Sequence, residues 1–169
     1  MKTKLNIIAL LICIIGFSQE NNKIKYSNIY INGISINQTK NNIVTNLNLT
    51  DTGLIYLDEI ANEESSIYTL NNNLNDLKSE FYFNNNILTN FDLLDSSFYL
   101  NNANLKVGNS IINIKTIFPI SYNNKSVKNG VGFINVDILM EDNTLSDEKL
   151  IINYNSLTNI ISSIHKRSN

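Results

Sequence analysis

Alternating apolar and polar residues are the clearest pattern in the chain, and a period of two is typical of strands with one buried face. The alternation is most regular at 134–140, where every second residue is Ile, Val or Met. Other segments rich in Ile, Tyr, Phe and Val, bounded by Asn, Asp, Ser and Gly, also predict strands. The predicted strands are 54–60, 66–70, 79–83, 87–93, 131–140, 149–154 and 157–164. Between them, 84–86 and 155–156 predict hairpin turns, because Asn tolerates a left-handed backbone.

Two further segments place apolar residues at helical spacing after a hydroxyl residue that suits a helix N-cap. The first reads ISINQTKNNIVTNL (34–47), with Thr39 as the cap. The second reads LKVGNSIINIKTIF (105–118), with Ser110 as the cap. Pro119 restricts the backbone of the residue before it, so the second helix is predicted to end there.

The same order of features, a short strand, a capped helix and several antiparallel strands, occurs twice in the chain. We therefore predict an α+β fold of two related units, 19–95 and 96–169, each with a short helical layer packed on an antiparallel β-sheet. Helices on one side would leave the other sheet face open. The alternative is one continuous α+β domain whose similar segments share only a codon bias toward Asn (33 residues) and Ile (27 residues).

The first residues have the three parts of a secretory signal peptide. Lys2 and Lys4 are followed by an almost wholly apolar run at 5–15, and Gly16 and Ser18 supply small residues for cleavage. The apolar run is shorter than the roughly 20 residues that span a membrane. Residues 1–18 are therefore predicted to be removed, which leaves an exported protein, periplasmic or secreted, without stable membrane insertion.

A lipoprotein acylated on Cys13 is the alternative for the leader. Cys13 follows the bulky Ile12 and lies inside the apolar run, which disfavours acylation. Cys13 is also the only cysteine of the chain, so disulfide frameworks and cysteine-based zinc sites are excluded.

Composition narrows the possible functions further. The 169 residues are 43% hydrophobic with a formal net charge of −2, which excludes a disordered chain and argues against nucleic-acid binding. The single histidine, His165, lies beside Lys166 and Arg167 near the C-terminus, and we interpret it as part of an exposed tail. No G-x-S-x-G motif is present. We predict a protein that is not an enzyme and that uses no metal or other cofactor.

Acidic pairs support an alternative function, a small extracytoplasmic hydrolase that uses carboxylates. The stretch EDNTLSDE (141–148) also holds oxygen ligands for calcium, but it lacks the central glycine and the spacing of an EF-hand. We interpret it as a solvated loop between two strands. The acidic pairs are Asp58-Glu59, Glu63-Glu64, Glu141-Asp142 and Asp147-Glu148.

Three tyrosines are the candidates for binding a partner. Phe81 and Phe83 share one face of a predicted strand and are assigned to the core, so Tyr82 points the opposite way. Tyr56 and Tyr68 are predicted to join Tyr82 on the open sheet face, because tyrosine suits surfaces that are apolar yet wettable. Ordinary cross-strand pairing on an exposed sheet is the alternative.

The segment LKVGNSIINIKTIFP (105–119) resembles the repeating unit of β-lactamase-inhibitor-protein-like domains and of the outer-membrane assembly lipoproteins related to BamE (SmpA/OmlA-type). In the first copy, Asn37 stands where those families have glycine. The resemblance implies a non-enzymatic module that binds an unknown protein partner with a concave sheet. A surface structural protein that self-associates through edge strands is a further alternative.

Overall fold

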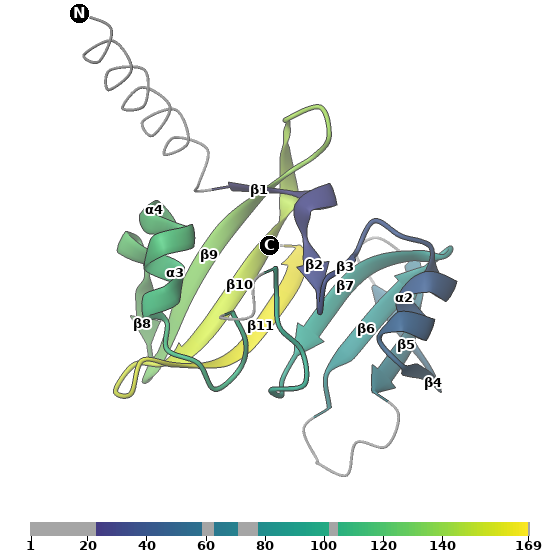
Figure 1. Cartoon of the computed structure of the whole chain (residues 1–169), viewed down its shortest axis with the longest axis horizontal. Helices are drawn as coiled ribbons and strands as arrows, with labels where there is room; N and C mark the ends of the chain where they lie inside the picture. Colours follow the sequence, from purple (N-terminus) through teal and green to yellow (C-terminus); the bar gives the residue numbers. More distant parts are fainter. Residues whose placement is uncertain (1–22, 59–62, 71–77, 102–104, 169) are drawn as a thin grey trace, which may run out of the picture.

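One mixed sheet of nine strands runs through the computed structural model, which describes residues 23–58, 63–70, 78–101 and 105–168 (Figure 1). The strand order is β1-β9-β10-β11-β7-β6-β5-β4, and β8 pairs with β9 beside β1. All described pairs of this sheet are antiparallel except β1 with β9. The strands are β1 (Lys23–Lys25), β4 (Leu49–Asp58), β5 (Glu63–Leu70), β6 (Glu80–Asn84), β7 (Ile87–Leu93), β8 (Ser126–Lys128), β9 (Val131–Leu139), β10 (Leu145–Asn155) and β11 (Ile160–Ser168).

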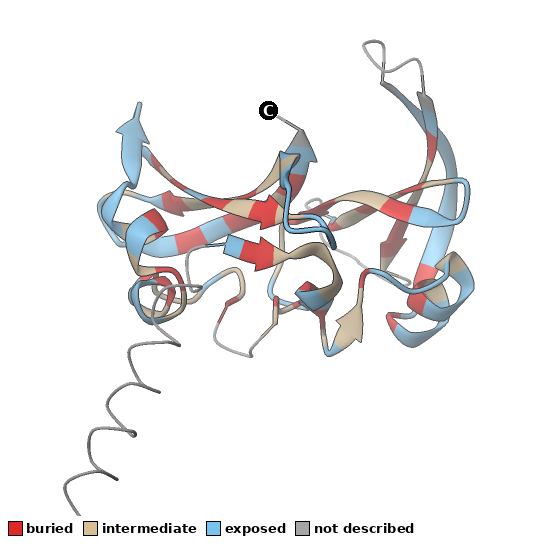
Figure 2. Cartoon of the chain, turned by 90° about the horizontal axis from the view of Figure 1, so that it is seen from above, coloured by how far each residue is buried: buried red, intermediate tan, exposed pale blue. Residues whose placement is uncertain are grey.

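The helices lie on one face of this sheet, and the ends of the sheet rise on the opposite side (Figure 2). Helix α2 lies at the end of the sheet that contains β4, and α3 and α4 lie at the end that contains β9 (Figure 1). A 3-10 turn and a short hairpin, β2 paired with β3, belong to the same layer. These elements are η1 (Tyr26–Asn28), β2 (Tyr30–Ile31), β3 (Ile34–Ser35), α2 (Lys40–Asn46), α3 (Ile112–Ile117) and α4 (Pro119–Asn123).

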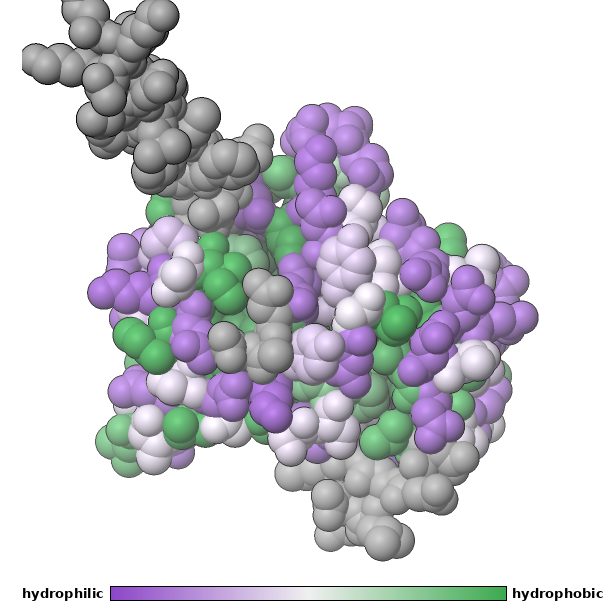
Figure 3. All heavy atoms as spheres, viewed as in Figure 1, coloured by the Kyte–Doolittle hydropathy of each residue, from purple (hydrophilic) through white to green (hydrophobic). Residues whose placement is uncertain are grey.

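The hydrophobic core fills the space between the sheet and the helical layer. Every second residue of the central strands is buried there, as the regular pattern of β9 shows: Ile134, Val136 and Ile138 are fully buried. Ile43 of α2 and Ile114 of α3 supply the buried residues of the two helices. The outer surface of this layer mixes hydrophilic and hydrophobic residues (Figure 3). The opposite sheet face carries no helix among the described residues, and we call it the open face.

Asparagine has a structural role in the turns. Among the described residues, every non-glycine residue with a positive φ is an asparagine. Two of them, Asn85 (φ 46°) and Asn86 (φ 69°), form the hairpin between β6 and β7 that the sequence predicts. The asparagines therefore do more than reflect codon bias, because their short polar side chains make the left-handed conformation accessible. The eight positions are Asn32, Asn48, Asn85, Asn86, Asn101, Asn129, Asn143 and Asn159.

The predicted fold class is wrong. The protein is mostly β and has one large mixed sheet, instead of an α+β fold with two helical layers, each on its own antiparallel sheet. Strand β7 pairs with β11 and so joins 49–93 to 131–168. Strand β1, from the predicted first unit, pairs in parallel with β9 of the second. The duplication of 19–95 and 96–169 stays a prediction.

The helix signals in the sequence were correct in place but not in extent. Thr39 occupies the N-cap position of α2, although its side chain makes no capping hydrogen bond. The prediction of Ser110 as the second cap is wrong by one residue: Ile111 is the N-cap of α3, and the Ser110 hydroxyl accepts a hydrogen bond from the backbone N–H of Ile112 (3.3 Å). Phe118 leaves the helical region, as predicted for a residue before proline. Pro119 then opens α4 at its first position, where its missing N–H costs no hydrogen bond.

The predicted signal peptide and the possible lipid attachment at Cys13 lie outside the described residues. In the part of the chain that the structure describes, no helix combines the length and the apolar character that crossing a membrane requires.

Candidate functional site

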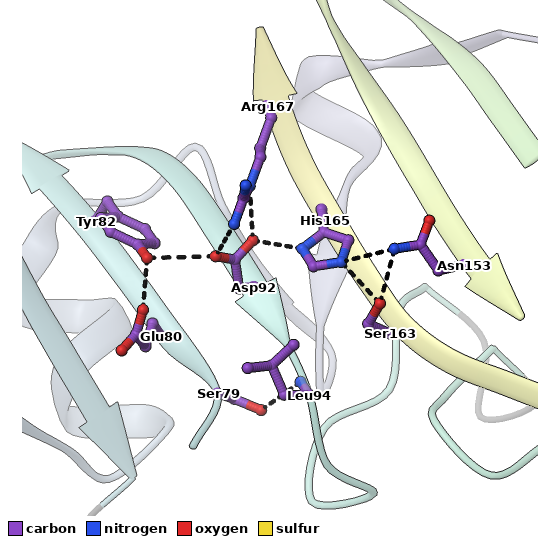
Figure 4. Close-up of polar contacts among 9 residues, drawn as sticks. All are labelled: Ser79, Glu80, Tyr82, Asp92, Leu94, Asn153, Ser163, His165 and Arg167. Carbon is purple, nitrogen blue, oxygen red and sulfur yellow. Dashed lines mark hydrogen bonds and ion pairs between the residues drawn. The ribbon is translucent and has the colours of Figure 1, made fainter. Parts of the chain in front are cut away.

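The centre of the open face holds a polar cluster where β11 meets β7 (Figure 4). Ser163, His165 and Arg167 are alternate residues of β11 and therefore point to the same side of the sheet. Asp92 is the cross-strand partner of His165 on β7, and Asn153 is the partner of Ser163 on β10. Residues far apart in the sequence, 73 positions in the case of Asp92 and His165, are brought together by strand pairing alone.

His165 connects a hydroxyl to a carboxylate. Its Nδ1 lies 2.5 Å from Asp92 Oδ1, and its Nε2 lies 2.7 Å from Ser163 Oγ. An ionised Asp92 can only accept, so Nδ1 carries a hydrogen and donates it to Asp92. In the neutral ring Nε2 is then an acceptor for the Ser163 hydroxyl. Asn153 Nδ2 donates to Ser163 Oγ (3.0 Å) and lies 3.2 Å from Nε2, which is consistent with this tautomer.

Asp92 has charged and polar partners on several sides. The Arg167 guanidinium donates to both carboxylate oxygens, through Nε to Oδ1 (3.0 Å) and through a terminal nitrogen to Oδ2. The Tyr82 hydroxyl lies 3.3 Å from Oδ2. Burial raises the pKa of Asp92, but the hydrogen bonds from His165 and Arg167 outweigh it, and the net pKa lies below the ordinary value. Asp92 therefore stays ionised, although only 4% of it is exposed.

Tyr82 extends the cluster toward β6 and β4. Its hydroxyl donates to Glu80 Oε2 (2.5 Å), and burial followed by this hydrogen bond raises the pKa of Tyr82, so the phenol stays neutral. The ring packs edge-to-face against Tyr56, with centroids 5.4 Å apart. The open face thus carries an aromatic pair directly beside the charged centre.

A hollow of about 380 Å³ adjoins the cluster on the other side, toward β9. Phe133 and Ile151 contribute apolar surface, and Asn153, His165 and Arg167 contribute polar groups. Such a mixture of apolar surface with a few polar groups is typical of binding surfaces.

The reverse side of the β7–β11 contact is also ionic. Lys166 points into the covered layer, is 1% exposed, and its Nζ contacts Glu148 Oε2 (2.5 Å) and the Thr89 carbonyl oxygen. Burial lowers the pKa of Lys166 more than Glu148 raises it. Nearby, burial and then the charge of Glu148 raise the pKa of Tyr26 to about 12. Charged groups therefore lie on both faces of this strand contact.

Two of the three candidate tyrosines are brought together, and the third is not. Tyr56 and Tyr82 share the open face, as predicted. Tyr68 pairs with Phe81 in the strand register, so it lies on the covered face with the core phenylalanines. Its hydroxyl donates to Asp51 (2.8 Å), and its ring contacts Phe83 edge-to-face. Residues opposite each other on paired strands lie on the same side, and this decides the position of Tyr68.

The interpretation of His165 as part of an exposed tail is wrong, because β11 extends through it to Ser168. Sequence reasoning also missed Asp92, Ser163, Arg167 and Asn153. The available signal was the alternation of Ser163, His165 and Arg167 at every second position, which is the period of a strand.

The acidic pairs do not form a common site among the described residues. Glu141 Oε1 accepts from the Ser27 backbone (3.1 Å), Asp142 accepts from Thr144 in its own turn, and Glu148 binds Lys166. Glu63 begins β5. The stretch 141–148 is a turn followed by the start of β10. Within the described ranges, no three His, Cys, Asp or Glu residues are grouped so that they could hold a metal ion.

Comparison of the chain with protein-family models, with curated proteins and with solved structures found no match in any of the three. The resemblance of 105–119 to the inhibitor-protein-like and BamE-like repeats therefore stays a prediction.

Proposed function

We propose that the chain is an exported, non-enzymatic binding protein that contacts a protein partner with its open sheet face. The supporting observation is the one-sided helical layer: no described helix covers the face opposite it, and the centre of that face is the hydrogen-bonded cluster of Asp92, His165 and Arg167. Residues at the centre of an interface bind best when their own rotamers are already fixed. Here strand pairing and hydrogen bonds fix them before a partner arrives.

The chemistry of the open face suits a protein partner. Tyr and Arg are the residue types enriched at the energetic centres of protein interfaces, and the face offers Tyr56, Tyr82 and Arg167 in one neighbourhood. The hollow beside them supplies Phe133 and Ile151 as apolar surface. Export, to the periplasm or the medium, is proposed from the pattern of residues 1–18.

We expect the partner to be found by crosslinking from the open face. Asn135 is exposed on that face, opposite Ile151, and Ile112 is exposed on α3 on the covered side. A photocrosslinking residue at 135 should give a discrete covalent adduct in the producing cell, and the same residue at 112 should not. Adducts from 112 alone, or none from 135, would contradict the proposal.

The affinity of the captured partner gives a second readout. Tyr56→Ala should weaken binding about tenfold, since a tyrosine buried in an interface contributes on the order of 1–2 kcal/mol. Tyr30→Ala is the matched control, because Tyr30 is 37% exposed against 46% for Tyr56 and lies in β2, away from the open face.

A second candidate function is hydrolysis of an ester, and the unbroken line from Ser163 through His165 to Asp92 favours it. Ser163 would be the nucleophile, His165 the base, and Asp92 the carboxylate that orients the base. The hydrogen bonds that join them, 2.7 Å and 2.5 Å long, are within the range that such a mechanism uses. Ser163 Oγ would attack the carbonyl carbon while its proton passes to His165 Nε2, which then protonates the departing alkoxide. Water would release the acyl group by the same route. Asn153 Nδ2, which donates to Ser163 Oγ in the structure (3.0 Å), would be the donor to the oxyanion in this mechanism. This machinery differs from the acidic pairs considered from the sequence.

A fluorophosphonate probe decides between the two candidates. A hydrolase should be labelled on Ser163, and both Ser163→Ala and His165→Gln should abolish labelling. Ser162→Ala is the matched control, because Ser162 neighbours Ser163 and is exposed. No labelling of the folded wild-type protein would exclude this serine mechanism and leave the cluster as part of the binding surface.

A further inference from the structure

The free edge of β4 carries a run of exposed apolar residues. Within the part of the chain that the structure describes, β4 is the last strand in the order of the sheet and pairs only with β5. Four consecutive residues of this strand are exposed, although all four are large and apolar. They are Leu54 (63%), Ile55 (64%), Tyr56 (46%) and Leu57 (51%).

The opposite edge of the sheet is built differently. There β1 and β8 are three residues long and read KIK and SVK, so the edge is short and carries lysines. Short strands and lysines are the usual protection of a sheet edge against further pairing. β4 has ten residues, and its segment from Thr52 to Leu57 contains no charged residue and no proline. Its pairing with β5 is irregular between Asp51 and Ile55, where Gly53 has a φ of +72°, and is regular from Ile55 to Asp58. From Ile55 to Leu57 the β4 edge is thus regular, apolar and free of the lysines that mark the opposite edge.

Another strand is the partner that suits an exposed strand edge, because alternate residues direct their backbone N–H and C=O groups away from the paired strand. In β4 the N–H groups of Gly53 and Leu54 already donate to the side chains of Asp51 and Thr52. A second copy of β4 fits this edge particularly well. In an antiparallel pair centred on Ile55, Leu54 faces Tyr56 of the second copy, and Ile55 faces its own equivalent. Each of these three residues then lies opposite an apolar residue of the second copy. A twofold axis relates the two copies, so the pairing forms a closed dimer.

We propose that two copies of the chain associate through antiparallel pairing of their β4 edges, centred on Ile55. The pairing buries the apolar run of both copies and satisfies outward-facing backbone groups. It also continues the sheet from one copy into the next, so the two open faces adjoin at Tyr56. The proposal does not depend on the identity of the partner proposed above.

Sedimentation of the purified protein at rising concentration tests the association. The wild-type protein should form dimers, and Ile55→Lys should weaken dimerisation about tenfold or more, because two lysines would face each other at the axis. Val127→Lys is the matched control, because Val127 is 59% exposed on β8 at the opposite edge, and this variant should dimerise normally. Circular dichroism should show the same strand content in all three proteins.

A cysteine pair tests the register independently of the lysine variant. Residues directly opposite in an antiparallel pair are about 5 Å apart, within reach of a disulfide. In a Cys13→Ser background, Ile55→Cys should therefore crosslink two copies under mild oxidation. Leu57→Cys, which would face Gly53 of the second copy, should not. A wild-type protein that stays monomeric, or crosslinking of the Leu57 variant without the Ile55 variant, would overturn the proposal.

Discussion

Asp92→Ala is expected to lower the free energy of unfolding by about 3 kcal/mol, because it leaves His165 and Arg167 without their shared carboxylate. The aspartate is nearly fully buried, so the two donors would lose a partner that water replaces only in part. Urea unfolding at neutral pH measures the effect. Asp137→Ala is the matched control: the pair that Asp137 forms with Lys149 is 3.8 Å long and both side chains are partly exposed, so its loss should change stability by less than about 1 kcal/mol.

The pH dependence of the same variant checks the cause. The pKa of Asp92 is lower in the folded protein than its ordinary value of 3.8, so its stabilisation is present above that value and is lost as the pH falls through the folded pKa. Wild type and Asp92→Ala should therefore converge in stability in acid, below about pH 3.8. A constant difference between them from neutral pH into acid would show that packing, and not charge, causes the loss.

Gly132→Ala is expected to destabilise the protein by about 3 kcal/mol, because the ring of Tyr154 occupies the position where a Cβ would stand. Gly132 and Tyr154 are cross-strand partners on β9 and β10, and Tyr154 is 2% exposed, so the ring has little room to move. The midpoint of urea unfolding gives the measurement. Gly130→Ala is the control: Gly130 has φ +81° and open space around it, so its cost of about 1 kcal/mol would come from the backbone alone.

A double variant separates the clash from other causes. If the ring is responsible, Gly132→Ala should cost much less in a Tyr154→Leu background, where no ring lies over the glycine. An equal cost in both backgrounds would contradict the steric explanation.

The strands and turns could be predicted because their signals are local. Alternation within 131–140 and the asparagines at 84–86 both lie within a few residues of the structure that they form. The union of the two halves was missed, because pairing of β7 with β11 depends on segments distant in the chain. The basic residues after Ile164 led to the prediction of an exposed tail where β11 continues. Lys166 is instead buried against Glu148, and composition alone does not suggest a buried lysine.

The candidate site shows the same division between local and distant information. Tyr82 was assigned to the open face correctly, because the phenylalanines on either side of it mark the covered face. The position of Tyr68 depends on which residue of β6 lies opposite, and a shift of one residue reverses the face. Asp92 acquires its role only through a strand that follows it by many residues, so its partners could not be recognised from its own neighbourhood.

Among the residues that the structure describes, three pairs join β7 to β11, whereas β10 and β11 share eight. Among the described central strands, from β9 to β4, this is the shortest strand contact. Side chains therefore contribute much of the connection between the two halves: His165 and Arg167 bind Asp92 on the open face, and Lys166 binds the Thr89 carbonyl oxygen on the covered face. A substitution in this group acts on the joining of the two halves as well as on the surface that a partner would meet.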